Sequence, residues 1–333
     1  MKTYNWGILG TGIIARKMAD ALPLVHQSKL FAAGSRKINT ARSFAGQYNV
    51  EKAYGSYEEL ANDPDIDIVY IATPHNLHCD NTIMCLNHGK HVLCEKPLAV
   101  NGREVRLMIN KAKEKNRFLM EALWTRFLPG LIKVKEMINA GRIGRIKLLK
   151  ADFGINRPFD PGHRLYNKQL IGGSLLDLGI YPLFLSLLLL GKPKTIKAIA
   201  GIGATGVDYS CSFTLGYEKA TLAVMYSSAI AQTDITAAIY GEKGTIIFDN
   251  WWYMPVPVKL ITPEGTEVPI PAKSVGNGYN YEAAEVIRCL EKAMIQSDLM
   301  SWDDSLLLID TLDAIRKEIG LVYPGHDDTP WKG

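Results

Sequence analysis

The chain has 333 residues, of which 47% are hydrophobic and 22% are charged, and its formal net charge is +4. This length suits about two domains, and the composition is that of an ordinary globular protein. The small net charge argues against a nucleic-acid partner, which requires clustered cations. One of the two longest uncharged runs, residues 178–191, is apolar but too short to cross a bilayer and contains Pro182, so we expect no membrane contact.

The cysteines indicate a reducing environment. There are five of them, and no pair has the C-x-x-C spacing of a zinc site, so we expect no metal. Unpaired thiols are typical of cytoplasmic proteins. The N-terminus runs directly into a predicted strand and lacks the apolar core of a signal peptide. We therefore expect a cytoplasmic protein.

Strands and helices alternate through the first part of the chain. The predicted strands are 4–9, 30–34, 67–72, 91–94 and 117–121, and the predicted helices are 13–22, 40–48, a helix opened by the capping box at Ser56, 76–88 and 100–115. This alternation predicts an α/β fold with a parallel sheet covered by helices on both faces. We assign residues 1–120 to an N-terminal Rossmann domain that binds a dinucleotide.

The pattern changes after residue 121. A helix at 129–140 precedes a strand at 146–153, a Gly/Pro-rich loop and an apolar helix that ends near Leu190. Residues 194–270 hold several strands without intervening helices, and helices near 281–294 and 303–320 close the chain. This order predicts an α+β domain with a large, mostly antiparallel open sheet. We assign residues 121–333 to substrate binding and dimerisation.

A glycine-rich turn joins the first strand to the first helix. Its sequence is G-x-G-x-x-A, in which Gly10 permits a tight turn, Gly12 lets backbone N–H groups approach a pyrophosphate, and Ala15 lets the helix pack on the strand. The motif lies in the βαβ context that dinucleotide binding requires. The predicted contacts of the turn are Gly10, Thr11, Gly12, Ile13 and Ile14.

The end of the second strand indicates which cofactor is bound. An acidic residue there would bind the ribose of NAD, but the chain reads Ser35-Arg36-Lys37. A hydroxyl and two cations suit the 2′-phosphate of NADP, although a solvated turn would read the same way. We predict NADP as the preferred cofactor, with NAD as the alternative.

Two further loops follow predicted strands. The loop after the strand 67–72 carries Thr73, Pro74, Asn76 and His78, which we expect to flank the nicotinamide half. The alternative for Asn76 is that it caps the helix that follows. The alternative for His78 is a position on the surface of that helix.

The next strand ends in Cys94-Glu95-Lys96-Pro97. It places Lys96 at the carboxyl end of a parallel strand, where open α/β sheets bind ligands. An ordinary solvated lysine is the alternative.

Together these motifs resemble a known family. The glycine turn, Ala-Thr-Pro-His-Asn at 72–76, Glu-Lys-Pro at 95–97 and the segment 172–181, which reads GGSLLDLGIY, are similar to the Gfo/Idh/MocA oxidoreductases over nearly the whole chain. The resemblance implies that Lys96 acts near the hydroxyl or carbonyl being oxidised or reduced, that Asp177 is the aspartate of the family's motif, and that the Lys96–Pro97 bond is cis. Asp177 can orient Lys96 or bind substrate hydroxyls, and we expect Glu95 to face the nicotinamide side. The resemblance also implies a homodimer formed through the C-terminal sheet. Many members of the family have histidine at the position of Tyr181. One branch of the family has tyrosine there, as this chain does.

The same residues make chemical sense. Oxidising an alcohol with a nicotinamide requires a base for the hydroxyl proton, and the reverse reaction requires an acid. A neighbouring Lys96 ammonium would favour the phenolate of Tyr181. Either residue can therefore carry the proton. Asp177 and Tyr181 have i, i+4 spacing on a predicted helix. The alternative is that Asp177 caps this helix and Tyr181 packs in the core.

Aromatic residues are candidates for a substrate wall. The candidates are Trp124, Arg126, Phe153, Trp251, Trp252 and Tyr253, because aromatic faces suit sugar rings and apolar diols alike. Of these we predict Trp124, Arg126 and Phe153 as substrate contacts; a position in the core or in an interface is the alternative for each. The expected activity is hydride transfer between NADP or NAD and a secondary alcohol or carbonyl of a sugar or diol. The alternatives are an NAD-dependent sugar or polyol dehydrogenase, and a non-catalytic nucleotide-sensing regulator on the same scaffold.

Overall fold

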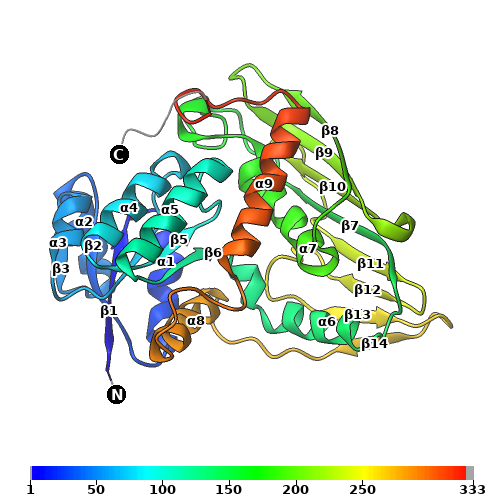
Figure 1. Ribbon diagram of the computed structural model, residues 1–333, viewed down its shortest axis with the longest axis horizontal. Coiled ribbons are helices and arrows are strands. Elements are labelled where there is room, and N and C mark those ends of the chain that lie inside the picture. The colour runs from blue at the N-terminus through cyan, green and yellow to red at the C-terminus, as the bar shows by residue number, and fades with distance from the viewer. Residues whose placement is uncertain (1, 328–333) are drawn as a thin grey trace. The chain divides into compact units, whose positions relative to one another are not determined.

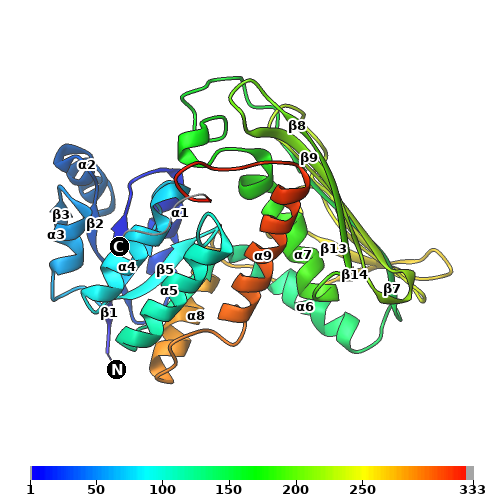
Figure 2. The ribbon, with the colours of Figure 1, turned by 45° about the horizontal axis from the view of Figure 1, so that its top comes forward.

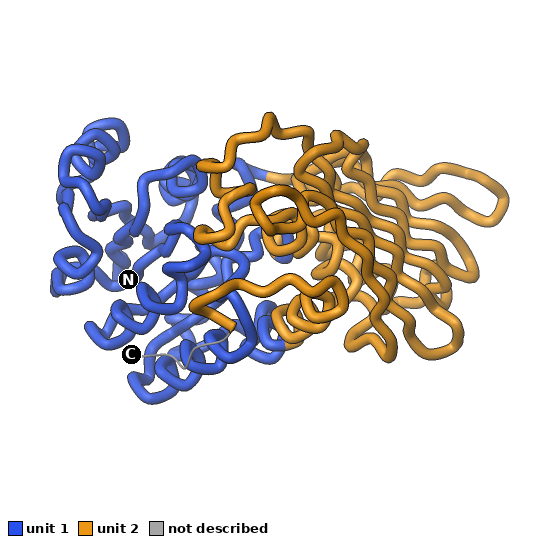
Figure 3. The backbone as a smooth tube through the Cα atoms, turned by 90° about the horizontal axis from the view of Figure 1, so that it is seen from above, with its two compact units in different colours: residues 1–126, 275–306, 331–333 blue, residues 127–274, 307–330 orange. Residues whose placement is uncertain are grey.

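The computed structural model describes residues 2–327. These residues form two compact units, shown in blue and orange in Figure 3. Within the described residues, unit 1 holds 2–126 and 275–306, and unit 2 holds 127–274 and 307–327.

Unit 1 is built on a six-stranded parallel sheet with strand order β3-β2-β1-β4-β5-β6 (Figure 1). The strands are β1 (Tyr4–Leu9), β2 (Ser28–Gly34), β3 (Lys52–Tyr54), β4 (Ile68–Ile71), β5 (His91–Glu95) and β6 (Leu119–Ala122). This is the order of a doubly wound dinucleotide-binding sheet, whose direction of winding switches between β1 and β4. Ligands bind at that point, beyond the carboxyl ends of the strands.

The helices of unit 1 follow the predicted alternation closely. They are α1 (Ile13–Ala21), α2 (Ile38–Tyr48), α3 (Tyr57–Asn62), α4 (His78–Asn87), α5 (Gly102–Lys115) and α8 (Tyr279–Glu291), with short 3-10 turns at Leu22–Leu24, His75–Leu77 and Trp124–Phe127. The predicted capping box is present, because Ser56 and Glu59 each accept a hydrogen bond from the backbone of the other. The three-residue strand β3 was not predicted, since it is too short to show a pattern.

The division of the chain differs from the predicted split at residues 1–120 and 121–333, because residues 275–306 pack with the Rossmann sheet. Helix α8 packs against α1. At the edge strand β6, the Leu119 amide donates to the Ile295 carbonyl (3.1 Å) and the Trp302 indole donates to the Leu119 carbonyl (3.0 Å). An edge strand leaves unpaired backbone groups, and this returning segment satisfies some of them.

Unit 2 contains an eight-stranded sheet with order β14-β13-β12-β11-β7-β10-β9-β8 (Figure 1). Its strands are β7 (Ile146–Gly154), β8 (Thr195–Ile202), β9 (Asp208–Gly216), β10 (Leu222–Ser228), β11 (Ala237–Gly241), β12 (Thr245–Phe248), β13 (Val258–Ile261) and β14 (Glu267–Ile270). All neighbouring pairs are antiparallel except β7 with β10, as expected for a mostly antiparallel sheet.

Helices of unit 2 cover one face of this sheet (Figure 2). The unit's elements are α6 (Pro129–Asn139), the π-helix Leu175–Gly179, α7 (Ile180–Leu190), and 3-10 turns at Lys168–Leu170 and Glu218–Ala220; α9 (Trp302–Glu318) contains the boundary between the units. The stretch Lys168–Leu190 has the length and hydropathy of a membrane span, but 83% of its most apolar window is buried inside the protein. This burial is typical of a core helix.

Candidate active site

The glycine turn after β1 has the geometry that a dinucleotide requires. Gly10 has φ +92°, and a Cβ there would lie 2.5 Å from the Ala72 carbonyl oxygen, so only glycine fits. Gly12 precedes the first turn of α1, and a Cβ on it would meet no atom within 4 Å. Ile13 is 76% exposed. The first N–H groups of α1 therefore border open space, which fits a pyrophosphate bound at the helix N-terminus.

The residues after β2 lie next to this turn in the sheet order. Arg36 and Lys37 are exposed, while the Ser35 amide donates to the Tyr54 carbonyl (3.2 Å). Arg36 also hydrogen-bonds to the Tyr57 hydroxyl, although burial still raises the pKa of Tyr57. Two exposed cations at this end of β2 fit the 2′-phosphate of NADP.

The conformation of the loop after β4 excludes one of the alternatives for Asn76. Asn76 lies within the 3-10 turn His75–Leu77, and neither this turn nor α4 has a side-chain cap. The cap interpretation is therefore wrong. Thr73 is buried, and its hydroxyl accepts a hydrogen bond from the Asn81 amide (3.0 Å).

His78 links two neighbouring loops of unit 1. Its Nδ1 lies 2.8 Å from the Pro97 carbonyl oxygen and its Nε2 lies 2.9 Å from the Thr73 carbonyl oxygen. The side chain is fully buried, which corrects the helix-surface alternative, and burial lowers the pKa of the imidazole. The neutral ring can donate to only one of these carbonyls. His78 therefore braces the loop that carries Lys96.

Two buried carboxyl groups, those of Glu95 and Glu121, accept hydrogen bonds from backbone amides of the loop that carries Lys96. The Lys96–Pro97 bond is cis, as the resemblance suggested. The Leu98 amide donates to Glu121 (2.9 Å), and the Lys96 amide donates to Glu95 (3.2 Å), which also accepts a hydrogen bond from Tyr70. The Glu95 side chain is thus turned towards Tyr70 inside the unit. Lys96 itself is half-buried at the end of β5.

The acidic side chains near Lys96 are buried away from water. Burial raises the pKa of Glu121 to about 7, and burial with the nearby Glu95 carboxyl raises the pKa of Glu282 well above its usual range. Clusters of perturbed carboxyl groups are typical of functional sites, although structural networks also produce them.

In unit 2, Asp177 lies on a π-helix rather than on the regular α-helix that the i, i+4 spacing assumed. Its carboxylate pairs with the Arg164 guanidinium at 2.8 Å and is 6% exposed, whereas Arg164 is 53% exposed. Asp177 provides no side-chain cap, so the capping alternative is wrong. Short π-helical turns occur frequently at functional sites.

Tyr181 is the second residue of α7, the helix that follows, and it faces an aromatic group. Its ring centre lies 5.5 Å from that of Phe153 and 5.1 Å from that of Tyr253, and these two stack at 4.3 Å. Burial and the Asp177 charge raise the pKa of Tyr253 to about 12, which places Asp177 near this group. Unit 2 therefore brings Tyr181 and Phe153 together, with Asp177 near the same aromatic group; their contact with a substrate stays a prediction.

Trp124 and Arg126 occupy packed positions in unit 1. Trp124 stacks on Tyr279, with ring centres 4.9 Å apart. The Arg126 guanidinium donates to the Leu299 carbonyl (2.7 Å), and both side chains are buried. Substrate contacts by these two residues stay a prediction.

Sequence reasoning missed Arg164 and Glu121 entirely and left Tyr253 outside the predicted contacts. Arg164 lies in an irregular loop, and Glu121 is a single acid in an apolar strand, so no periodic pattern marks either. For Glu121 one signal was available, because an acidic residue at the end of a predicted apolar strand is unusual.

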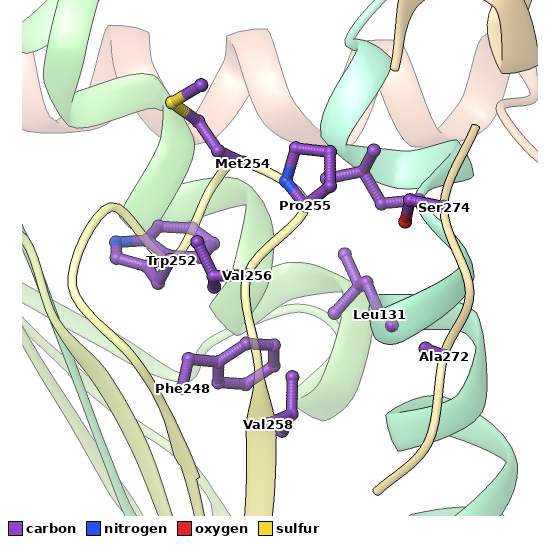
Figure 4. Close-up of a pocket in the computed structure, with 11 residues that line it drawn as sticks. Leu131, Phe248, Trp252, Met254, Pro255, Val256, Val258, Ala272 and Ser274 are labelled. Atoms are coloured by element: carbon purple, nitrogen blue, oxygen red, sulfur yellow. The ribbon is translucent and has the colours of Figure 1, made fainter. Parts of the chain in front are cut away.

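An apolar pocket elsewhere in unit 2 is too small for a substrate. It lies beside α6 and β13 and is lined by residues such as Leu131, Phe248 and Trp252 (Figure 4). The cavity volume open to a water molecule is about 10 Å³, enough for a single water molecule.

Comparison with known proteins defines the class. The family model described as "Oxidoreductase family, NAD-binding Rossmann fold" matches residues 4–123, and the GFO/IDH/MocA C-terminal domain matches residues 131–247. The chain belongs to the Gfo/Idh/MocA family of NAD(P)-dependent oxidoreductases.

Its curated relatives include trans-1,2-dihydrobenzene-1,2-diol dehydrogenases. The Xenopus laevis enzyme is 38% identical over 96% of this chain and 99% of its own length, and the Homo sapiens enzyme is 35% identical over 96% and 98%. They agree with the resemblance of the segments 53–60, 121–127 and 176–181 to dihydrodiol dehydrogenase.

Solved structures show the same fold. An aldose-aldose oxidoreductase from Caulobacter crescentus superposes with a TM-score of 0.86 at 24% identity, covering 95% of this chain and 97% of that one. A levoglucosan dehydrogenase in complex with NADH gives 0.84 at 21% identity, covering 95% and 97%.

The buried Glu121 predicts a pH-dependent stability. Its pKa in the folded protein is raised from 4.5 to about 7, so its contribution to stability is full below pH 4.5 and is lost as the pH rises through 7. The loss amounts to at most about 3 kcal/mol. Glu121→Gln, which is always neutral, should gain stability relative to the wild type between pH 5 and pH 8, measured by urea unfolding.

The exposed Glu114, whose pKa is lowered by Lys111, provides the matched control. Glu114→Gln should show no such gain. Equal pH dependence of the wild type and Glu121→Gln would contradict the prediction.

Proposed function

We propose that this protein is an NADP-preferring dehydrogenase or reductase that acts on a secondary alcohol or the matching carbonyl of a sugar or diol. The relatives that are 35–38% identical are named diol dehydrogenases, and structural neighbours are named sugar oxidoreductases. The nicotinamide supplies or accepts the hydride, and the protein moves a proton at the substrate oxygen.

The observation that carries this proposal is the cluster on unit 2. A π-helical turn presents Asp177, the first turn of α7 carries Tyr181, and Phe153 and Tyr253 form an aromatic wall beside them. A hydroxyl next to an acid and flat apolar faces suits a polyhydroxylated ring or diol.

Each residue has a defined part in the proposal. Tyr181 gives or takes the proton, and Lys96, aimed by its braced loop, polarises the substrate oxygen and favours the phenolate. Asp177, paired with Arg164, binds a substrate hydroxyl. Each half of this assignment rests on the geometry of its own unit.

Replacing the tyrosine tests the proton role. Tyr181→Phe should lower turnover by about 10²–10⁴-fold, because it removes the general acid or base while keeping the ring. NADPH binding, measured by fluorescence quenching, should be unchanged. Tyr4→Phe, which removes a hydroxyl from β1, is the control. Near-normal turnover of Tyr181→Phe with an inactive Lys96→Met would assign the proton to Lys96 instead.

The cofactor preference is tested at Arg36. Arg36→Ala should weaken NADP binding by about 10- to 100-fold while NAD binding changes little, because a charged hydrogen bond to a phosphate is worth about 1.5–3 kcal/mol. Titration of both cofactors with Lys37→Ala as comparison gives the measurement. An unchanged ratio of NADP to NAD affinity would reject this role.

We also propose that a homodimer forms through the uncovered face of the large sheet. Ile199, Leu222 and Val224 share this face by strand register and are 75%, 44% and 39% exposed, whereas the opposite face of β10 is buried. Adjacent exposed apolar side chains of this kind mark association surfaces.

A charge on this face should prevent association. Val224→Glu would place a carboxylate in the proposed apolar contact, so sedimentation should show a monomer where the wild type is a dimer. Val268→Glu, at an exposed position on β14, should remain dimeric. A dimeric Val224→Glu would place the interface elsewhere.

A further inference from the structure

One buried acid holds the segment that carries Asp177 and Tyr181. Asp208, the first residue of β9, is fully buried. Its Oδ2 accepts a hydrogen bond from the Ser174 hydroxyl (2.8 Å) and another from the Leu175 amide (2.7 Å). The carboxyl group is therefore hydrogen-bonded to the start of the π-helix, at Leu175, two residues before Asp177.

The same segment is pressed onto the sheet so closely that only glycine fits. Gly173 has φ +125°, and a Cβ there would lie 2.2 Å from Oδ1 of Asp208. A Cβ at Gly179 would lie 2.9 Å from the Ser227 hydroxyl, which is itself 3.0 Å from the Ser174 hydroxyl. Two glycines of the motif, Gly173 and Gly179, are thus explained by contact with β9 and β10.

The neighbours of Asp208 leave its charge poorly compensated. Tyr323 donates to the Gly172 carbonyl (2.5 Å), and the pKa values of the Tyr323 hydroxyl and the Cys211 thiol are both raised by burial and by Asp208, so both groups are neutral. Arg316 lies beyond Tyr323, and its charge is shared by two acids, Asp313 and Asp327.

We propose that Asp208 is a positioning residue for catalysis, whose carboxylate form fixes the first turn of the π-helix and thereby the orientation of Asp177 and Tyr181. This inference rests on the proposed function of Tyr181. Asp208 touches only the Ser174–Leu175 end of the segment, so it acts through the turn and not on the substrate.

The energetics of Asp208 favour a functional role. Burial raises its pKa from 3.8 to about 6, against the opposing hydrogen bonds from Ser174 and Leu175. A raised pKa means that its contribution to stability is present below pH 3.8 and is lost as the pH rises through about 6. At neutral pH the ionised carboxylate therefore lowers stability, as a group kept for function does.

Hydrogen exchange of residues 172–181, followed by mass spectrometry, tests the inference directly. At pH 8, protection of this segment, corrected for intrinsic rates, should be about tenfold lower in Asp208→Asn than in the wild type, because a neutral acceptor binds the Ser174 hydroxyl and the Leu175 amide more weakly than a charged one. The kcat of Asp208→Asn should fall about tenfold at pH 8 with an unchanged KM for NADP, and the acid limb of kcat near pH 6 should be lost.

The control is Asp63→Asn, which replaces another buried, hydrogen-bonded carboxylate in unit 1 and should leave the 172–181 exchange unchanged. If Asp208→Asn does not fold, Ser174→Ala should show the same loss of protection at pH 8 to a smaller degree. Wild-type-like exchange in the folded variant would overturn the inference. Loss of protection in Asp208→Asn, found together with a wild type that turns over no alcohol or carbonyl, would instead overturn only the proposed function.

Discussion

Hydrogen bonds between buried side chains and the backbone hold both groups of candidate catalytic residues. In unit 1, Glu121 accepts a hydrogen bond from the Leu98 amide and His78 lies 2.8 Å from the Pro97 carbonyl oxygen, at the two residues that directly follow Lys96. In unit 2, Asp208 binds the Leu175 amide ahead of Asp177. A catalytic side chain is useful only where its backbone is fixed, and buried polar groups fix it with both direction and distance.

These supports reduce stability. Glu121 and Asp208 have raised pKa values because burial disfavours their charge, so each weakens the folded state as the pH rises to neutrality. An apolar residue of similar size would avoid that loss, but it could not bind a backbone amide. The protein therefore combines large apolar cores with a few destabilising acids beside the segments proposed to do the chemistry.

The two units contribute different kinds of group. Unit 1 offers open backbone N–H groups at Gly12 and exposed cations after β2, which suit a phosphorylated dinucleotide. Unit 2 offers an acid, a phenol and stacked aromatic rings, which suit a hydroxylated substrate. Membership of an oxidoreductase family joins these roles in one reaction, because hydride transfer needs a cofactor site and a proton donor or acceptor.

The sequence by itself determined the alternating α/β order, the glycine turn, the capping box at Ser56 and the motifs at Lys96 and 172–181, because these depend on local spacing. Only the tertiary structure showed that residues 275–306 return to the first sheet, that Asp177 lies on a π-helix paired with Arg164, and that His78, Glu121 and Asp208 brace the loops. Those contacts join residues that are distant in the chain, and burial and pKa follow from such contacts rather than from sequence pattern.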